Sequence, residues 1–513
     1  MRKIALCTLL AAAVAYAQFG RGAGDFSTSG ADAQRSSWIR SDAKISPTNL
    51  QKPGFSLLWK VKLNNEAKQS ASLTPAALLT SYIGYRGFRA LGFVGGSSDK
   101  VFAMDTDLGR IEWQKPIASS SSTCGMTANV TRPVSAAFPP AGGVGRGFGG
   151  RGGAAKSGVG EPGEGSVVLK EIEARNVAAG GTPQPGRRGG GNNAGRGAPA
   201  APGAPGAPPP GFGGGRRMPN YLHAISSDGM FHSMYVSNGE EPEPPIKFLP
   251  PNSSAMGLIV IDNVAYTVTG SGCGSAANTV WALDIAGKQA ASWQASGGGI
   301  AGSDGVAFGP DGTVYVATAA GELAALEAKT LKVRDIFKAG VPFTTSPVVF
   351  QDKEAVMVAA AAKDGRIYVV DGAKLGGPVS KSDPLPAPPD TLASWQDSAG
   401  TRYLLASTAN ALAAIKFADQ SGTPALSSAW TRDIASPLAP LVVNGVVCAG
   451  TTGKQNTPDV LYALDGATGN PLWDSGKTIA SFVKGGGISG GGSQIYLGTN
   501  DGTFYAFGFP IEH

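Results

Sequence analysis

The sequence has few cysteines, few histidines and little charge. Of its 513 residues four are cysteines and three are histidines, and charged residues make up 16%. Three histidines are too few for a histidine-rich metal centre, and so few cysteines exclude a scaffold held mainly by disulfides. The fold must therefore rest on a hydrophobic core, which the 42% of hydrophobic residues can supply.

Long apolar runs are also missing. Arg2 and Lys3 precede an apolar run, Ile4–Val14, and the small residues around Ala15 and Ala17, which is the pattern of a secretory signal peptide. That run is shorter than the roughly 20 apolar residues of a membrane helix, and no later segment approaches this length. We therefore expect a signal peptide at residues 1–17 and an exported protein, periplasmic or secreted, with no transmembrane segment.

The net charge of +6 comes from one segment rather than from the whole chain. Residues 139–218 contain ten basic and four acidic residues, so the rest of the sequence is close to neutral. The segment is rich in Gly, Pro and Arg and cannot bury enough apolar surface to order itself. We expect a disordered insert that acts as a spacer or binds anionic envelope polymers; export argues against a nucleic-acid partner.

A repeat of about 45 residues fills most of the remaining chain. Its best copy is Val460–Trp473, in which Leu461–Asp465 is followed by Thr-Gly and Leu-Trp. Eight copies can be aligned on the position of Asp465, and the later ones are 43 to 49 residues apart, the length of one propeller blade. The aligned residues are Asp105, Tyr235, Asp284, Glu327, Asp371, Lys416, Asp465 and Gly508.

Each copy reads as four short strands. Asp-Gly pairs, such as Asp228-Gly229 and Asp501-Gly502, separate the second strand from the third and suit the positive φ of tight hairpins. The prediction is an all-β fold, an eight-bladed β-propeller of four-stranded antiparallel blades at residues 55–513, preceded by a lead-in segment at 18–54. The insert should interrupt blade 2 between its first and second strands.

The last copy ends too early to contain a fourth strand. Leu57–Leu63 looks like a fourth strand without its first three. We expect the two to share a blade, because pairing the N- and C-terminal strands removes the free edges of an open sheet.

The repeat resembles the PQQ repeat, which occurs in quinoprotein alcohol dehydrogenases and in the non-enzymatic propeller of the outer-membrane-protein assembly machinery. The lead-in adds to this resemblance, since Gly30–Ser36 and Ile45–Leu50, followed by Trp59, are similar to the start of the dehydrogenases. The resemblance implies the propeller fold, and for the dehydrogenases it implies PQQ and calcium as cofactors.

The resemblance does not extend to the catalytic features of the dehydrogenases. Their chemistry needs PQQ held against a ring of two adjacent bonded cysteines, a Ca²⁺ on oxygen ligands and a carboxylate base. This sequence has no adjacent cysteine pair and no Cys-x-x-Cys-His for an attached haem. It favours a non-enzymatic protein and nominates no catalytic or metal-binding residue, although PQQ and calcium binding without the cysteine clamp stays open.

The sharpest prediction from the sequence is a disulfide between Cys124 and Cys273. Both cysteines start a Cys-Gly turn with Asn five residues later, and both are expected in loops on the same face of neighbouring blades. Cys448, between Val and Ala residues of a strand, reads as a buried small hydrophobe. His232 occupies a repeat position and is expected to be structural.

Three functions are compatible with this sequence. The leading hypothesis is a binding or assembly scaffold that receives a protein or glycan partner on one propeller face. The alternatives are a PQQ- and calcium-dependent dehydrogenase that oxidises alcohols or sugars, and a surface module that docks to the envelope through its basic insert.

Overall fold

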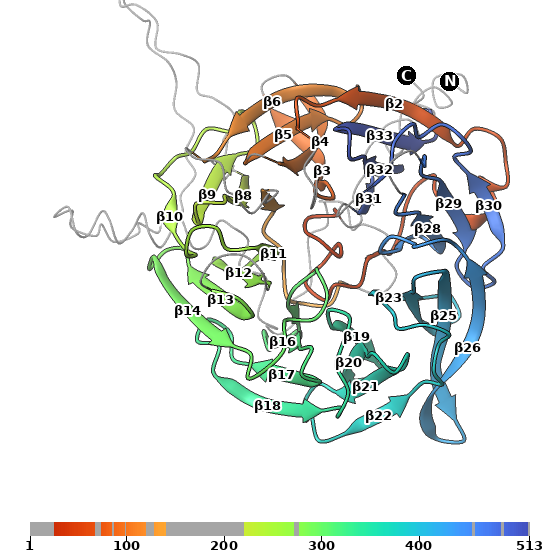
Figure 1. Cartoon of the computed structure of the whole chain (residues 1–513). Helices are drawn as coiled ribbons and strands as arrows, with labels where there is room; N and C mark the ends of the chain where they lie inside the picture. The colour runs from red at the N-terminus through yellow and green to blue at the C-terminus, as the bar shows by residue number, and fades with distance from the viewer. Residues whose placement is uncertain are drawn as a thin grey trace, which may run out of the picture. The chain divides into compact units, whose positions relative to one another are not determined.

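The computed structural model describes residues 25–66, 73–84, 87–97, 99–118, 128–139, 220–270, 276–453, 457–483 and 487–510. Within this part of the chain, eight β-sheets stand around a central axis (Figure 1). The signal peptide predicted at 1–17 lies outside the described residues. None of the described helices is long and apolar enough to cross a membrane.

The blades follow one another in chain order. Blades 1 to 4 consist of β3 (Ala77–Gly84), β4 (Gly87–Gly96), β5 (Lys100–Asp105) and β6 (Arg110–Pro116); β7 (Asn129–Thr131), β8 (Tyr221–Ile225), β9 (Met230–Tyr235) and β10 (Ile246–Lys247); β11 (Ala255–Ile261), β12 (Val264–Thr269), β13 (Thr279–Asp284) and β14 (Gln289–Gln294); and β15 (Ala307–Phe308), β16 (Val314–Ala317), β17 (Glu322–Leu326) and β18 (Val333–Lys338).

Blades 5 to 8 continue the same pattern. They consist of β19 (Val348–Asp352), β20 (Ala355–Ala361), β21 (Ile367–Asp371) and β22 (Pro378–Lys381); β23 (Thr391–Gln396), β24 (Arg402–Ser407), β25 (Ala411–Gln420) and β26 (Thr423–Asp433); β27 (Leu441–Val443), β28 (Val446–Gly450), β29 (Leu461–Asp465) and β30 (Pro471–Asp474), with β1 (Trp38–Ile39) beside β27; and β31 (Ile488–Gly491), β32 (Gln494–Gly498), β33 (Thr503–Gly508) and β2 (Ser56–Lys62).

The predicted eight blades of four antiparallel strands are confirmed. Seven of the eight repeat positions aligned with Asp465 fall on the third strand of their blade, including Lys416 on β25 of the weakest copy, and Glu327 directly follows the third strand β17. The ring closes as expected: β2 pairs antiparallel with β33, and Val61 lies opposite Phe504.

The two faces of the ring carry different turns. Because neighbouring strands are antiparallel, turns between first and second strands and between third and fourth strands emerge on one side, called face one here. Turns between second and third strands emerge on the other side, face two, with the connections between blades. The Asp-Gly turns lie on face two, and their glycines Gly229, Gly365 and Gly502 have φ between 77° and 83°.

The place of the insert is confirmed. The described chain reaches residue 139 after β7 and resumes at residue 220 before β8, and these are the first and second strands of blade 2, paired through Asn129 and Ile225. Residues 140–219 themselves lie outside the described part of the chain.

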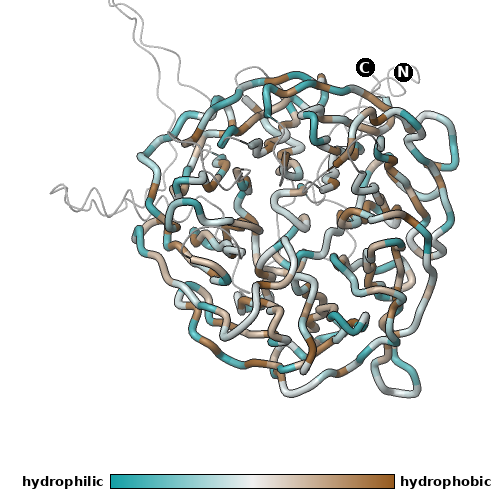
Figure 2. Tube along the Cα trace, viewed as in Figure 1, coloured by the Kyte–Doolittle hydropathy of each residue, from teal (hydrophilic) through white to brown (hydrophobic). Residues whose placement is uncertain are grey.

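The hydrophobic core is divided among clusters that neighbouring blades share. One cluster combines Leu79 and Phe93 of blade 1 with Leu222 and Met234 of blade 2. Figure 2 shows hydrophobic residues recurring along the strands around the ring. Burial between blades therefore fixes the ring without one central core.

Tryptophans of the fourth strands join each blade to the next. Their indole nitrogens donate hydrogen bonds of 2.9–3.0 Å to carbonyl oxygens in a face-one turn of the following blade. The pairs are Trp59 with Thr106, Trp113 with Val236, and Trp430 with Gly466. A glycine lies under each indole, because an added Cβ at Gly109, Gly239 or Gly469 would approach the ring within 2.5–2.8 Å.

Candidate functional site

The lead-in segment lines the axis of the ring. Between residues 25 and 42 it touches the first strand or its turn in every blade, in the order in which the blades follow one another, and Figure 1 shows it in red inside the ring. The contacts are Phe26 with Leu78, Ser27 with Arg132, Thr28 with Leu258, Ala33 with Phe308, Gln34 with Val349, Ser36 with Ser394, Ser37 with Val442, and Asp42 with Ser493.

Most of these contacts use backbone atoms. Carbonyl groups of the lead-in accept hydrogen bonds from backbone N–H groups of the inner strands, at 2.7 Å for Phe26 and 2.9 Å for Gln34. Beyond Asp42 the segment forms the short helix α2 (Pro47–Leu50) and then enters β2. The segment thus covers inner-strand edges that would otherwise be unpaired.

Arg35 fastens the lead-in to blades 3 and 4. Its side chain is only 1% exposed. Nε donates to the carbonyl of Val306 at 2.9 Å and Nη2 to that of Gly257 at 2.7 Å, while Nη1 donates to Thr28 Oγ1 at 3.2 Å. Burial lowers the pKa of Arg35 to about 10, so the guanidinium remains charged near neutral pH.

The described residues do not fit a calcium-bound quinone on the axis. Backbone and side chains of the lead-in occupy the inner edges of all eight blades. In the part of the chain that the structure describes, no group of three His, Cys, Asp or Glu side chains is placed to hold a metal ion. The sites that remain are on the faces of the ring.

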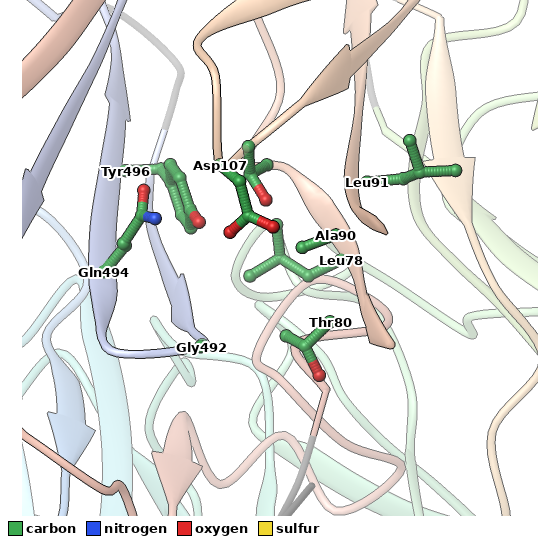
Figure 3. Close-up of a pocket in the computed structure, with 10 residues that line it drawn as sticks. Leu78, Thr80, Ala90, Leu91, Asp107, Gly492, Gln494 and Tyr496 are labelled. Carbon is green, nitrogen blue, oxygen red and sulfur yellow. The ribbon is translucent and has the colours of Figure 1, made fainter. Parts of the chain in front are cut away.

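A small cavity lies at the closure of the ring, between blades 8 and 1. Its volume is about 10 Å³, close to the roughly 10–15 Å³ that one water molecule needs. Figure 3 shows Gln494 and Tyr496 on the blade 8 side, with Leu78, Thr80 and Asp107 on the blade 1 side. The cavity therefore has room for about one water molecule and not for a side chain or a sugar ring.

Gln494 gives this cavity a free acceptor. The residue is 3% exposed, and its side-chain oxygen Oε1 has no hydrogen-bond partner. A buried amide oxygen without a donor costs about 1–3 kcal/mol, so a water molecule that donates a hydrogen bond to this oxygen would be stabilised.

Blade 1 also carries an apolar surface on face one. Among the described residues five large hydrophobic side chains are exposed, and four of them belong to this blade. They are Ile83 and Phe88 at the tip of the β3–β4 hairpin, exposed by 41% and 72%, and Leu108 and Ile111 at the β5–β6 turn, exposed by 56% and 37%. We call these four residues the blade 1 patch.

A partly buried ion pair holds the two halves of the blade 1 patch together. Arg89, on β4 next to Phe88, is paired with Glu112, on β6 next to Ile111. The two side chains are only 13% and 8% exposed. The hairpin is therefore tied to the β5–β6 turn, and the apolar surface is presented by a rigid element.

The two cysteines of the predicted disulfide, Cys124 and Cys273, lie outside the described residues, in segments 119–127 and 271–275. Their pairing stays a prediction. The interpretation of Cys448 is confirmed, since this residue lies on β28 and is 2% exposed. Burial raises the pKa of its thiol to about 12, which makes it unreactive.

His232 has hydrogen-bonding partners of the kind expected for a structural residue. It is buried on β9, with Nε2 at 2.9 Å from Ser226 Oγ and Nδ1 at 3.3 Å from Glu241. Burial lowers its pKa despite this carboxylate. The features that reasoning from the sequence missed are the path of the lead-in, the acceptor of Gln494 and the blade 1 patch.

Comparison with known proteins supports the fold. Residues 276–508 match a family model described as outer membrane protein assembly factor BamB. No curated protein matches the chain.

Solved structures of propellers are similar over nearly the whole chain. The quinohemoprotein alcohol dehydrogenase from Comamonas testosteroni is 12% identical, with 97% of this chain and 82% of that chain covered and a TM-score of 0.57. A europium-containing methanol dehydrogenase is 11% identical, with coverages of 96% and 99% and a TM-score of 0.56. BamB from Moraxella catarrhalis is 12% identical, with coverages of 90% and 99% and a TM-score of 0.47.

At these identities the structural neighbours show the fold and not an activity. The repeat and the closed ring of eight four-stranded blades agree, so the chain is an eight-bladed β-propeller, and its residues 276–508 match the family model.

Proposed function

We propose that the protein is an exported, non-enzymatic binding or assembly scaffold that holds a protein partner on face one of blade 1. The blade 1 patch is the observation that carries this proposal. Exposed apolar side chains that gather on one rigid element are typical of interaction sites, and in the described part of the chain the other seven blades together expose a single large hydrophobic side chain, Val333.

The surroundings of the patch favour a protein partner. Phe88 offers an aromatic anchor of the kind that dominates binding energy in protein interfaces. Charged groups of Arg89, Arg110 and Glu112 lie next to it and can form a polar rim.

Two other functions have less support. A glycan partner leaves the apolar patch unexplained. A dehydrogenase would need a quinone site, which the described residues do not supply on the axis, and docking through the basic segment 139–218 concerns residues outside the described structure.

The experiment compares Phe88→Ser with Val333→Ser, an equally conservative change at the exposed apolar residue of blade 4. A photoreactive amino acid placed at position 83 is used to cross-link partners in envelope extracts. We expect one discrete cross-linked protein that is lost in the Phe88→Ser background and kept in the Val333→Ser background. Both substitutions are at exposed positions and should change stability by less than about 0.5 kcal/mol.

Two results would refute the proposal. One is a cross-linked product that persists unchanged when Phe88 is replaced. The other is oxidation of alcohols or sugars with an artificial electron acceptor after incubation with PQQ and Ca²⁺. A variant lacking residues 140–219 tests the docking alternative, because partner capture should survive this deletion.

A further inference from the structure

Two arginines from distant parts of the chain share one indole ring. The guanidinium carbon of Arg40, in the lead-in, lies 4.2 Å from the ring centroid of Trp38. That of Arg402, the first residue of β24, lies 5.6 Å from the same centroid and 5.3 Å from the ring of Phe350. The indole of Trp38 thus gathers two positive charges close to the turn between β23 and β24, on face one.

Arg402 has no carboxylate partner within ion-pair distance in the described part of the chain. Arg402 is 8% exposed and forms no ion pair with a described residue. Its Nη2 donates to the carbonyl of Gln351 at 3.2 Å and at most weakly to Gln396 Oε1 at 3.5 Å, and its Nε has no hydrogen-bond partner.

Arg40 has one acidic neighbour and does not hydrogen-bond to it. Its Nη1 is 3.9 Å from Asp32. The carboxylate of Asp32 already accepts hydrogen bonds from the backbone N–H of Ser36 at 2.9 Å and from the hydroxyl of the same residue at 2.5 Å. The donors of Arg40 are therefore available, and its side chain, 18% exposed, can be reached from solvent.

This arrangement is unfavourable for the free protein. Burial and, to a smaller extent, the charge of Arg40 lower the pKa of Arg402 to about 10, although the charge of Asp352 acts in the opposite direction. Cation–π contacts offset only part of the cost of burying a charge without a counterion. An anion bound beside the two guanidiniums would reduce the repulsion and could accept a hydrogen bond from the free Nε–H donor of Arg402.

We propose that Arg40, Trp38 and Arg402 form a binding site for an oxyanion, a carboxylate or a phosphate group. The planar fork of a guanidinium matches two oxygens of such a group, and two guanidiniums contact the same indole here. Arg402 forms the buried wall of the site and Arg40 its solvent side. The proposal rests on side chains of the described ring and is independent of the partner proposed for blade 1.

The test is titration calorimetry of the mature protein with sodium phosphate and with sodium glucuronate, each against sodium chloride of the same ionic strength. We expect saturable binding of at least one oxyanion by the wild type. Arg40→Gln should weaken it at least tenfold, since one bidentate charged contact is lost. Arg334→Gln changes an arginine that is 49% exposed and serves as the matched control, with no change in affinity expected.

Comparing phosphate with glucuronate shows whether the site prefers a phosphate group or a carboxylate. Binding of phosphate alone indicates a free or esterified phosphate, and binding of glucuronate alone indicates the carboxylate of a sugar acid. Arg402→Gln should abolish binding, and if that variant does not fold, Arg40→Gln decides, because Arg40 donates no hydrogen bond in the described structure. Absence of saturable binding by the wild type, or equal affinities of the wild type and Arg40→Gln, would overturn the proposal.

Discussion

Replacing Arg35 tests whether the lead-in is an integral part of the ring. The change Arg35→Met keeps much of the volume and removes the hydrogen bonds of 2.9 and 2.7 Å that join the lead-in to Val306 and Gly257 of blades 4 and 3, together with two bonds to Thr28 and Ser29 within the lead-in. Carbonyl oxygens of Val306 and Gly257 would lose a charged donor, at about 1–3 kcal/mol for each buried group left unpaired.

The cost of burying the guanidinium of Arg35 partly offsets this loss of stability. Burial of the guanidinium itself costs free energy, as its lowered pKa shows, and the variant avoids that cost. The net loss should therefore be near 3 kcal/mol, within the range measured when one member of a buried charged network is removed. Arg35→Lys keeps the charge but not the planar fork, so it should stay closer to Arg35→Met than to the wild type.

Equilibrium unfolding in urea, followed by tryptophan fluorescence, measures this loss, and limited proteolysis shows whether the lead-in is released first. Arg334→Met is the control, because the ion pair of Arg334 with Asp311 is exposed and such pairs contribute about 0–1 kcal/mol. Equal unfolding midpoints for Arg35→Met and Arg334→Met would refute the role assigned to Arg35.

Three further predictions concern packing, pH and thiols. Gly469→Ala should lower the free energy of unfolding, measured by heat or urea, by about 2 kcal/mol more than Gly422→Ala. Both glycines have positive φ, but only at Gly469 would the added Cβ meet an indole, that of Trp430 at 2.6 Å. Equal losses of stability in the two variants would contradict the packing of Gly469 under Trp430. Burial lowers the pKa of His223 to about 4, so the unfolded state binds this proton first as the pH falls below about 6.5, and stability is lost between about pH 6.5 and 4. Compared with His223→Gln, the wild type should lose about 2–3 kcal/mol of unfolding free energy between pH 7 and 4.5. The same dependence of stability on pH in the two proteins would exclude this contribution of His223. Mature protein unfolded without reductant should release a single titratable thiol, that of Cys448, because the other two cysteines are expected to be paired; three thiols would refute the disulfide.

The fold could be predicted because its signals are local and repeated. The period of the Asp465 position, the Asp-Gly turns and the lone fourth strand around Val61 each point to the same ring, and the structure agrees with all three. Even the weak copy at Lys416 could be placed, because the spacing of its neighbours left room for one blade and no more.

The blade 1 patch could not be predicted by the same reasoning. Ile83 and Phe88 have the strand-forming side chains that elsewhere in the repeat are buried between blades. They are exposed because β3 and β4 extend beyond β5, which begins to pair with β4 only at Leu91. A sequence pattern predicts which side chains of a strand alternate between the two faces of the sheet, but not the residue at which pairing with the neighbouring strand ends.

The path of the lead-in is harder still, because it depends on backbone groups. Seven consecutive inner strands present N–H or C=O groups toward the axis, and any short segment of irregular backbone could in principle satisfy them. Two residues select this segment: Arg35 donates to the carbonyls of Val306 and Gly257, and Trp38 pairs with the inner strand β27. Such a selection involves groups more than 200 residues apart, so no local pattern encodes it. The same geometry that closes the axis to a cofactor brings Arg40 to Arg402, which means that the site we propose for an oxyanion exists only in the folded ring.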